Sequence, residues 1–218
     1  MANLTTIDRM AQTKHVVLQA AISVFAAEGF HGADVQVIAD RAGVGKGTVY
    51  RHFGDKEKLF LAAARHALEQ VARSIGQEMR PGQGTASFLR TIATGCARYY
   101  SAHPEAVELI LQERALFRKS TTPTHLLRRS EGQQGVEDEL RRGVERGELW
   151  PIDVDAMYEA FGDLLFGCIV NGVLGEEASS LVTRVQRAVE MFLQGITRDG
   201  EGFGGRRNPS NRKTGGGS

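Results

Sequence analysis

The chain has 218 residues, of which 41% are hydrophobic and 24% charged, a composition typical of a globular protein with one large or two smaller domains. No apolar run approaches the roughly 18 residues of a membrane span, and the N-terminus lacks a signal peptide, so we expect a cytoplasmic protein without a membrane partner. Cys96 and Cys168 are too few and too isolated for a disulfide framework or zinc knuckle, which favours free, buried thiols.

The first predicted helix follows a loose arm of residues 1–12. Thr13 is placed to cap a helix that runs to about Glu28, and Gly29 ends it. Phe30 is expected to fill the small core beneath this helix. Its predicted apolar face is formed by Val17, Ala20, Ala21, Val24 and Phe25.

Residues 33–59 read as two short helices that meet at a glycine turn. The first has apolar residues at positions i, i+3, i+4 and i+7, as a 3.6-residue period requires. Asp34 stands at its N-cap, Gly43 supplies a left-handed C-terminal residue, and Val44 fills the bend. The apolar stripe comprises Val35, Ile38, Ala39 and Ala42.

In the second short helix Val49 and Phe53, four residues apart, point inward. The pair of helices is therefore a helix-turn-helix. Between residues 41 and 58 there are five basic residues against two acidic ones, a local net charge of +3 that suits a phosphate backbone. The outward residues are Lys46, Gly47, Thr48, Tyr50, Arg51 and His52.

Gly54 is predicted to stop this helix and Asp55 to cap a longer one over about residues 55–75. The segment 76–84 contains Pro81 and several glycines and is interpreted as a connector. The inward face of the long helix comprises Leu59, Phe60, Ala63, Ala67 and Val71.

Five further helix-like segments follow, and no strand-like alternation appears, so the fold class is all-α. Asp153 or Asp155 is a candidate cap for the fourth of them and Ser179 for the fifth. The Gly-rich, basic tail 199–218 is expected to be disordered. The five segments span about 85–102, 104–118, 124–147, 154–174 and 179–197.

The segment 154–174 is apolar on nearly all sides, so it needs partners on all sides. A single neighbouring helix does not meet that need. We therefore expect a homodimer in which the last two helices pack against their copies. The predicted interface residues are Phe166, Ile169, Val170, Val185, Val189 and Phe192.

The run IADRAGVGKGTVYRHFGDKEKL resembles the DNA-binding signature of the TetR family of bacterial transcriptional regulators, and the resemblance covers about residues 14–60. It implies an N-terminal helix-turn-helix domain, residues 1–54, and a C-terminal effector-binding and dimerisation domain, residues 55–198, with the helix 55–75 shared as connector.

Recognition helices read base edges from their N-terminal residues, which places Lys46 for DNA contact. Gly47 would let the helix backbone approach a groove closely. Thr48 donates hydrogen bonds, and Arg51 suits guanine or phosphate. The resemblance assigns Tyr50, His52 and Lys56 to phosphates, although Tyr50 also fits a half-buried core position. Asp34 departs from the family's usual hydroxyl and would repel a phosphate.

The resemblance further implies a pocket for a small organic effector in the C-terminal domain. In the alternative reading, Glu113 and Arg114 form ordinary ion pairs and the aromatic residues are core. The predicted lining residues are Cys96, Tyr99, Tyr100, Ile110, Glu113, Arg114, Phe117, Tyr158, Phe161 and Leu165.

Motifs for other functions are incomplete in this sequence. The run GVGKGT lacks P-loop spacing and follows a helix, and the single Glu28 to His31 pair does not make a di-iron site. We therefore predict no catalytic residues, no metal and no cofactor. The sequence favours a ligand-responsive regulator of operator DNA, most simply a repressor, over the alternative of a helical ligand-binding or scaffold protein that uses its helix-turn-helix for protein contacts.

Overall fold

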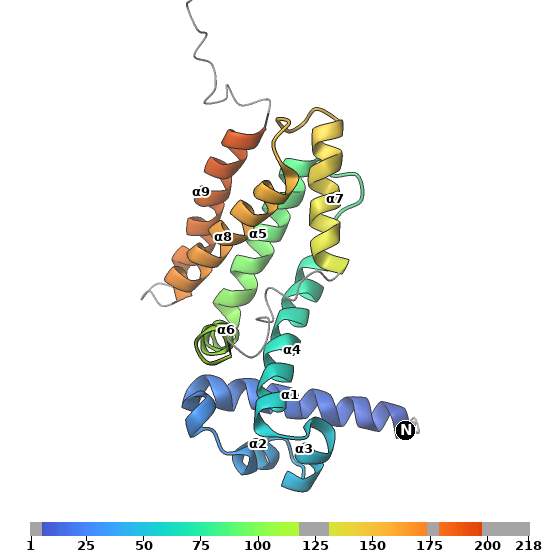
Figure 1. Cartoon of the computed structure of the whole chain (residues 1–218), viewed down its shortest axis with the longest axis vertical. Helices are drawn as coiled ribbons and strands as arrows, with labels where there is room; N and C mark the ends of the chain where they lie inside the picture. The colour runs from blue at the N-terminus through green and yellow to red at the C-terminus, as the bar shows by residue number, and fades with distance from the viewer. Residues whose placement is uncertain (1–5, 118–130, 174–178, 198–218) are drawn as a thin grey trace, which may run out of the picture.

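A computed structural model describes residues 6–117, 131–173 and 179–197 (Figure 1). The predicted all-α class is confirmed: within these residues the only β pairing is one isolated bridge between Leu149 and Thr197. The helices are α1 (Thr6–Gly32), α2 (Val35–Arg41), α3 (Lys46–Phe53), α4 (Lys56–Gly76), α5 (Thr85–Ala102), α6 (Pro104–Leu116), α7 (Glu131–Glu145), α8 (Val154–Val173) and α9 (Ser179–Ile196).

The helices form two groups that α4 connects. In Figure 1, α1 lies across α2 and α3 at the lower end, and α4 rises from them toward α5, α7, α8 and α9. Helix α6 lies at the junction, where it packs against both α1 and α4. No helix among the described residues is long and apolar enough to cross a membrane.

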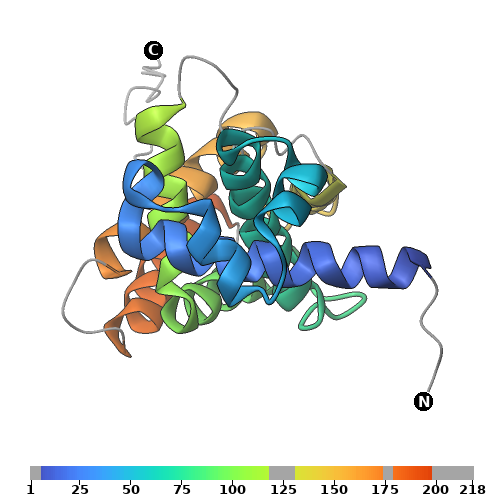
Figure 2. The same ribbon diagram turned by 90° about the horizontal axis from the view of Figure 1, so that it is seen from below.

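The first helix begins earlier than predicted, so the expected loose arm is wrong for residues 6–12. Helix α1 starts at Thr6, and Thr13 lies inside it, where its hydroxyl donates to the Arg9 carbonyl at 2.8 Å. Residues 6–12 contain no proline or glycine, so nothing stops the helix before Thr13. The predicted break at Gly29 is confirmed by its φ of 71°. Figure 2 shows the N-terminal half of α1 projecting beyond the other helices.

The structure resolves one later helix start and one helix end. Asp153 caps α8, since its carboxylate accepts from the amides of Asp155 at 2.9 Å and Ala156 at 3.4 Å. Helix α6 ends at Leu116, close to the predicted residue 118. The predicted stretches 1–5, 124–130 and 199–218, and the cap at Ser179, lie outside the residues or side chains that the structure describes.

Four phenylalanines join the helix-turn-helix to the rest of the molecule. The Phe60 ring of α4 lies 5.1 Å from Phe25 and 5.4 Å from both Phe30 and Phe117, measured between centroids. Phe117 follows α6, and Gln112 of α6 donates to the Phe25 carbonyl of α1 at 3.0 Å. The end of α6 is therefore packed directly on the N-terminal unit.

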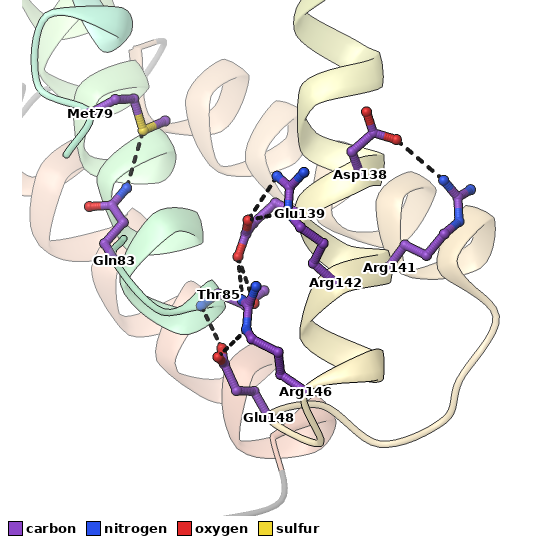
Figure 3. A network of polar contacts seen from close by, with 9 residues as sticks. All are labelled: Met79, Gln83, Thr85, Asp138, Glu139, Arg141, Arg142, Arg146 and Glu148. Carbon is purple, nitrogen blue, oxygen red and sulfur yellow. Dashed lines mark hydrogen bonds and ion pairs between the residues drawn. The ribbon is translucent and has the colours of Figure 1, made fainter. Parts of the chain in front are cut away.

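At the other end of the molecule, a polar cluster ties α5 to α7 (Figure 3). The buried Thr85 hydroxyl donates to Glu139 at 3.0 Å, and the Thr85 amide donates to Glu148 at 2.8 Å. Arg146 bridges Glu139 at 2.7 Å and Glu148 at 2.6 Å. Hydrogen bonds from Arg146 and the Thr85 amide lower the pKa of Glu148 to about 2. The start of α5 is thus capped by a carboxylate distant in the sequence.

The predicted dimer residues divide into two groups. Val185, Val189 and Ile169 are buried inside the single chain, at 0%, 1% and 7% exposure, so they are core residues and not available to a partner. Helix α9 packs mainly on α5 and α8, which explains the burial of Val185 and Val189. Phe166, Val170 and Phe192 are half-buried, as a partly covered interface would require. Met191, which was not predicted, is 74% exposed.

Candidate nucleic-acid interface

The turn between α2 and α3 is closed by backbone hydrogen bonds. Gly43 adopts a φ of 68°, and its amide donates to the Asp40 carbonyl at 3.1 Å. The Val44 amide donates to the Ala39 carbonyl at 3.0 Å, which completes a Schellman motif. Val49 of α3 is 1% exposed and anchors the second helix on the core. The predicted helix-turn-helix therefore has its expected caps and packing.

Helix α3 presents one face to solvent, on the side of the molecule seen in Figure 2. Tyr50 is 40% exposed, which excludes the alternative of a core aromatic. Arg51 is exposed and forms no ion pair with any described residue, so its guanidinium is available to a ligand. Thr48 and His52 are half-buried beside them, and Gly47 is exposed.

Lys46 is not a free cation. Its ammonium lies 3.3 Å from the Asp34 carboxylate, which also accepts from the Gln36 amide at 2.8 Å. These two contacts hold the pKa of Asp34 below its usual value, with the Gln36 amide as the larger cause. The sequence identified Asp34 as a cap but missed its pairing with Lys46.

Lys56 lies in the first turn of α4, against the end of α1. Its ammonium donates to the His31 carbonyl at 3.1 Å and lies 5.2 Å from the centroid of the Phe30 ring. Asp55 caps the helix by accepting from the Lys58 amide at 2.8 Å. Lys56 is therefore half-buried and held in one orientation at the N-terminus of α4, where Asp55 already accepts from one of the first amides.

The sequence of residues 17–63, which forms this helix-turn-helix, matches the family model of the bacterial regulatory proteins of the tetR family. The match spans most of α1, all of α2 and α3, and the first part of α4. Residues 17–63 are therefore a DNA-binding domain of the TetR type. The chain is accordingly a helix-turn-helix transcriptional regulator.

Curated proteins similar to this chain are transcriptional regulators. The chain is 26% identical over 193 residues to the repressor AcnR of Corynebacterium efficiens, an alignment that covers 86% of this chain and 97% of AcnR. It is 29% identical over 102 residues to the repressor NicS of Pseudomonas putida, which covers 47% of this chain and only 48% of NicS.

A solved structure of similar fold is FadR of Bacillus subtilis in complex with stearoyl-CoA. Its TM-score is 0.69 at 19% identity, and the match covers 84% of this chain and 98% of FadR. At this identity the likeness concerns the fold alone.

The residues predicted to line an effector pocket are brought together only in part. Glu113 is 1% exposed, and Tyr100, Ile110, Phe117, Phe161 and Leu165 are also buried. Cys96, Tyr99 and Tyr158 are half-buried, and burial raises the pKa of Tyr99. Arg114 is exposed, with its guanidinium carbon 4.6 Å from the centroid of the Phe166 ring. Arg114 therefore does not share the buried surroundings of Glu113, although the two residues are adjacent in α6.

A hollow that the sequence did not predict lies between α1 and α6. This open groove has a volume of about 490 Å³. Two carboxylates, Glu105 and Glu108, stand on its α6 side, and Ile22 and Ala26 contribute apolar surface from α1. None of the residues that line it belongs to the predicted pocket, and no single helix carries a signal for it.

Proposed function

We propose that the chain binds operator DNA as a homodimer through α3 and Lys56, and that a small organic effector in the C-terminal helices releases it, so that it acts as a repressor. The observation that carries this proposal is the solvent-facing side of α3, where Arg51 and Tyr50 are exposed next to an oriented Lys56. A recognition helix anchored by a buried Val49 has the geometry to enter a major groove.

The effector site is proposed among the buried residues of α5, α6 and α8. Glu113 would supply the polar anchor in an otherwise apolar and aromatic region that includes Tyr100, Ile110, Phe161 and Leu165. The complex of FadR with stearoyl-CoA supports the idea that this fold accommodates an organic ligand. A ligand that favours one arrangement of α4 would change the spacing of the two recognition helices.

The dimer is proposed to form through the outer faces of α8 and α9. The half-buried Phe166, Val170 and Phe192 and the exposed Met191 supply apolar surface for it. Two-fold symmetry would place the recognition helices on half-sites one helical turn apart. No enzymatic activity is included in the proposal, and the relatives named above are regulators.

The test of the proposal is the binding of random genomic DNA fragments as the salt concentration is raised. Phosphate contacts release counterions, so we expect the affinity to fall steeply with salt. Sequencing of the retained fragments is expected to yield a palindromic site. Affinity that does not depend on salt would contradict the proposal and favour the scaffold alternative.

Lys56 and Arg51 are expected to contribute differently to DNA binding. Lys56→Ala should weaken binding to all sequences about equally, because the ammonium would contact a phosphate. Arg51→Ala should cost about 1–3 kcal/mol on the selected site and relax the base preference at one position. Selection of sites from a random library with each variant measures both effects. A changed base preference with Lys56→Ala would show that these two roles are wrongly assigned.

Gly47 is expected to contribute to DNA affinity and not to the stability of the fold. A Cβ built at Gly47 meets no atom within 4 Å, so Gly47→Ala should raise the free energy of unfolding by up to about 1 kcal/mol. Affinity for DNA should nevertheless fall, because the added methyl group would separate the helix backbone from the groove. Denaturation and DNA titration of the same preparation measure the two effects.

The matched control is Gly135→Ala in α7, where a Cβ also meets no atom within 4 Å. It should stabilise the chain and leave DNA affinity unchanged. If Gly47→Ala binds DNA as well as the wild type does, Gly47 has no role in close approach.

A further inference from the structure

The N-terminus of α2 is occupied by the chain's own carboxylate. Free amides at a helix N-terminus favour an anion, and beside a recognition helix that anion is ordinarily a DNA phosphate. Here Asp34 accepts from the Gln36 amide at 2.8 Å, and its side chain is 59% exposed. A phosphate that approached this end of α2 would meet a negative charge.

The same carboxylate holds the first residue of α3. The Lys46 ammonium lies 3.3 Å from the Asp34 carboxylate, and its side chain is still 40% exposed. An ammonium has three N–H donors, so one bond to Asp34 leaves others directed at solvent. Lys46 is thus held in one place without being buried, and part of its charge is neutralised.

We propose that Asp34 is a specificity-determining residue of the DNA site, which acts by positioning Lys46. This inference rests on the proposed DNA-binding function. On random DNA, the only contact that Lys46 gains is with a phosphate. To make that contact its ammonium must leave Asp34, whose carboxylate then lies unpaired beside the negatively charged DNA backbone. On the correct site, Lys46 stays on Asp34 and donates its remaining N–H groups to acceptors on a base edge, such as guanine O6 or N7. Asp34 therefore weakens non-specific binding more than specific binding.

Two substitutions separate this role from simple helix capping. Asparagine also caps helices well, so Asp34→Asn keeps the contact with the Gln36 amide and removes the charge that holds Lys46. Asp40→Asn is the matched control, because Asp40 is exposed on the same helix and bonds to the Gln36 side chain at 2.7 Å, not to Lys46. Both variants change the net charge equally.

The experiment uses the full chain, a random-sequence duplex pool and a duplex carrying the selected site, each titrated over a range of salt. We expect Asp34→Asn to tighten binding to the random pool by about two- to fivefold, the range that exposed ion pairs span. The slope of log affinity against log salt on that pool should steepen by about 0.9, as one added phosphate contact requires. Binding to the selected site should change less, so the ratio of the two affinities falls.

Lys46→Met, alone and combined with Asp34→Asn, tests the coupling. Without Lys46, Asp34→Asn should have little effect on the affinity ratio, and Asp40→Asn should leave that ratio unchanged in any background. An affinity ratio that Asp34→Asn leaves unaltered, or alters equally without Lys46, would overturn the inference. Asp34→Ser, which also caps, repeats the test if the asparagine variant proves unfolded.

The failure of this inference is distinguishable from failure of the proposed function. If the wild-type chain shows no salt-dependent DNA binding, both the proposed function and the role of Asp34 are overturned. A wild-type chain that binds DNA normally, with an affinity ratio that Asp34→Asn does not change, overturns only the role of Asp34.

Discussion

Phe60→Ala is expected to lower the free energy of unfolding by about 3–5 kcal/mol, the range for truncating a buried aromatic side chain. Phe60 is 0% exposed, and its ring contacts Phe25 and Phe30 of α1 and Phe117 at the end of α6. Alanine would leave a cavity where α1, α4 and the end of α6 meet. Chemical denaturation at one fixed protein concentration, followed by circular dichroism, measures the loss.

Phe60→Leu is the control, since it keeps most of the apolar volume and removes only the ring contacts. It should cost clearly less than alanine. Because Phe30 also lies beneath the Lys56 ammonium, both variants should be compared for DNA affinity under conditions where they remain folded. A loss below about 1 kcal/mol for Phe60→Ala would mean that the four rings are not a shared core.

Gly143→Ala is expected to lower the free energy of unfolding by about 1–3 kcal/mol through overpacking. A Cβ at this position would lie 2.5 Å from the Thr85 hydroxyl oxygen and 3.1 Å from the Leu149 side chain. The hydroxyl has little freedom to retreat, because it donates to Glu139 and accepts from Arg146 (Figure 3). Accommodating the methyl group would therefore push α7 away from α5 or break the polar cluster.

A second glycine of α7 serves as a control for the sign of this change in the free energy of unfolding. Gly135→Ala in the same helix meets open space and should stabilise the chain by about 0.5–1 kcal/mol, because alanine is the better helix former. Opposite signs for the two glycines, measured by the same denaturation experiment, are expected. If Gly143→Ala also stabilises, the close packing of α7 on α5 is not present in solution.

Much of the DNA-binding unit was predictable because its determinants are local. Asp34 caps α2, Gly43 ends it and Gly54 ends α3, each through contacts a few residues away in the sequence. Thr13 shows the limit of such signals. It is a good cap residue, but the preceding residues also favour helix, so α1 continues through it from Thr6.

The effector and dimer predictions depend on which side of a helix faces which neighbour. Val185 and Val189 have the apolar spacing of an interface, yet α5 and α8 cover them within the chain. Glu113 and Arg114 are adjacent in sequence, but one is buried and the other exposed. Helical periodicity reveals that a face is apolar and does not reveal what covers it.

The sequence by itself determined the all-α class, the helix-turn-helix and its caps, and the residues that α3 presents, since backbone hydrogen bonds and helical period act over a few residues. Only the tertiary structure decided that Lys46 pairs with Asp34, that Phe117 packs on Phe60, and that Glu148 caps α5 from 63 residues away. These contacts join separate helices. Their distances follow from how whole helices pack, which no short stretch of sequence specifies.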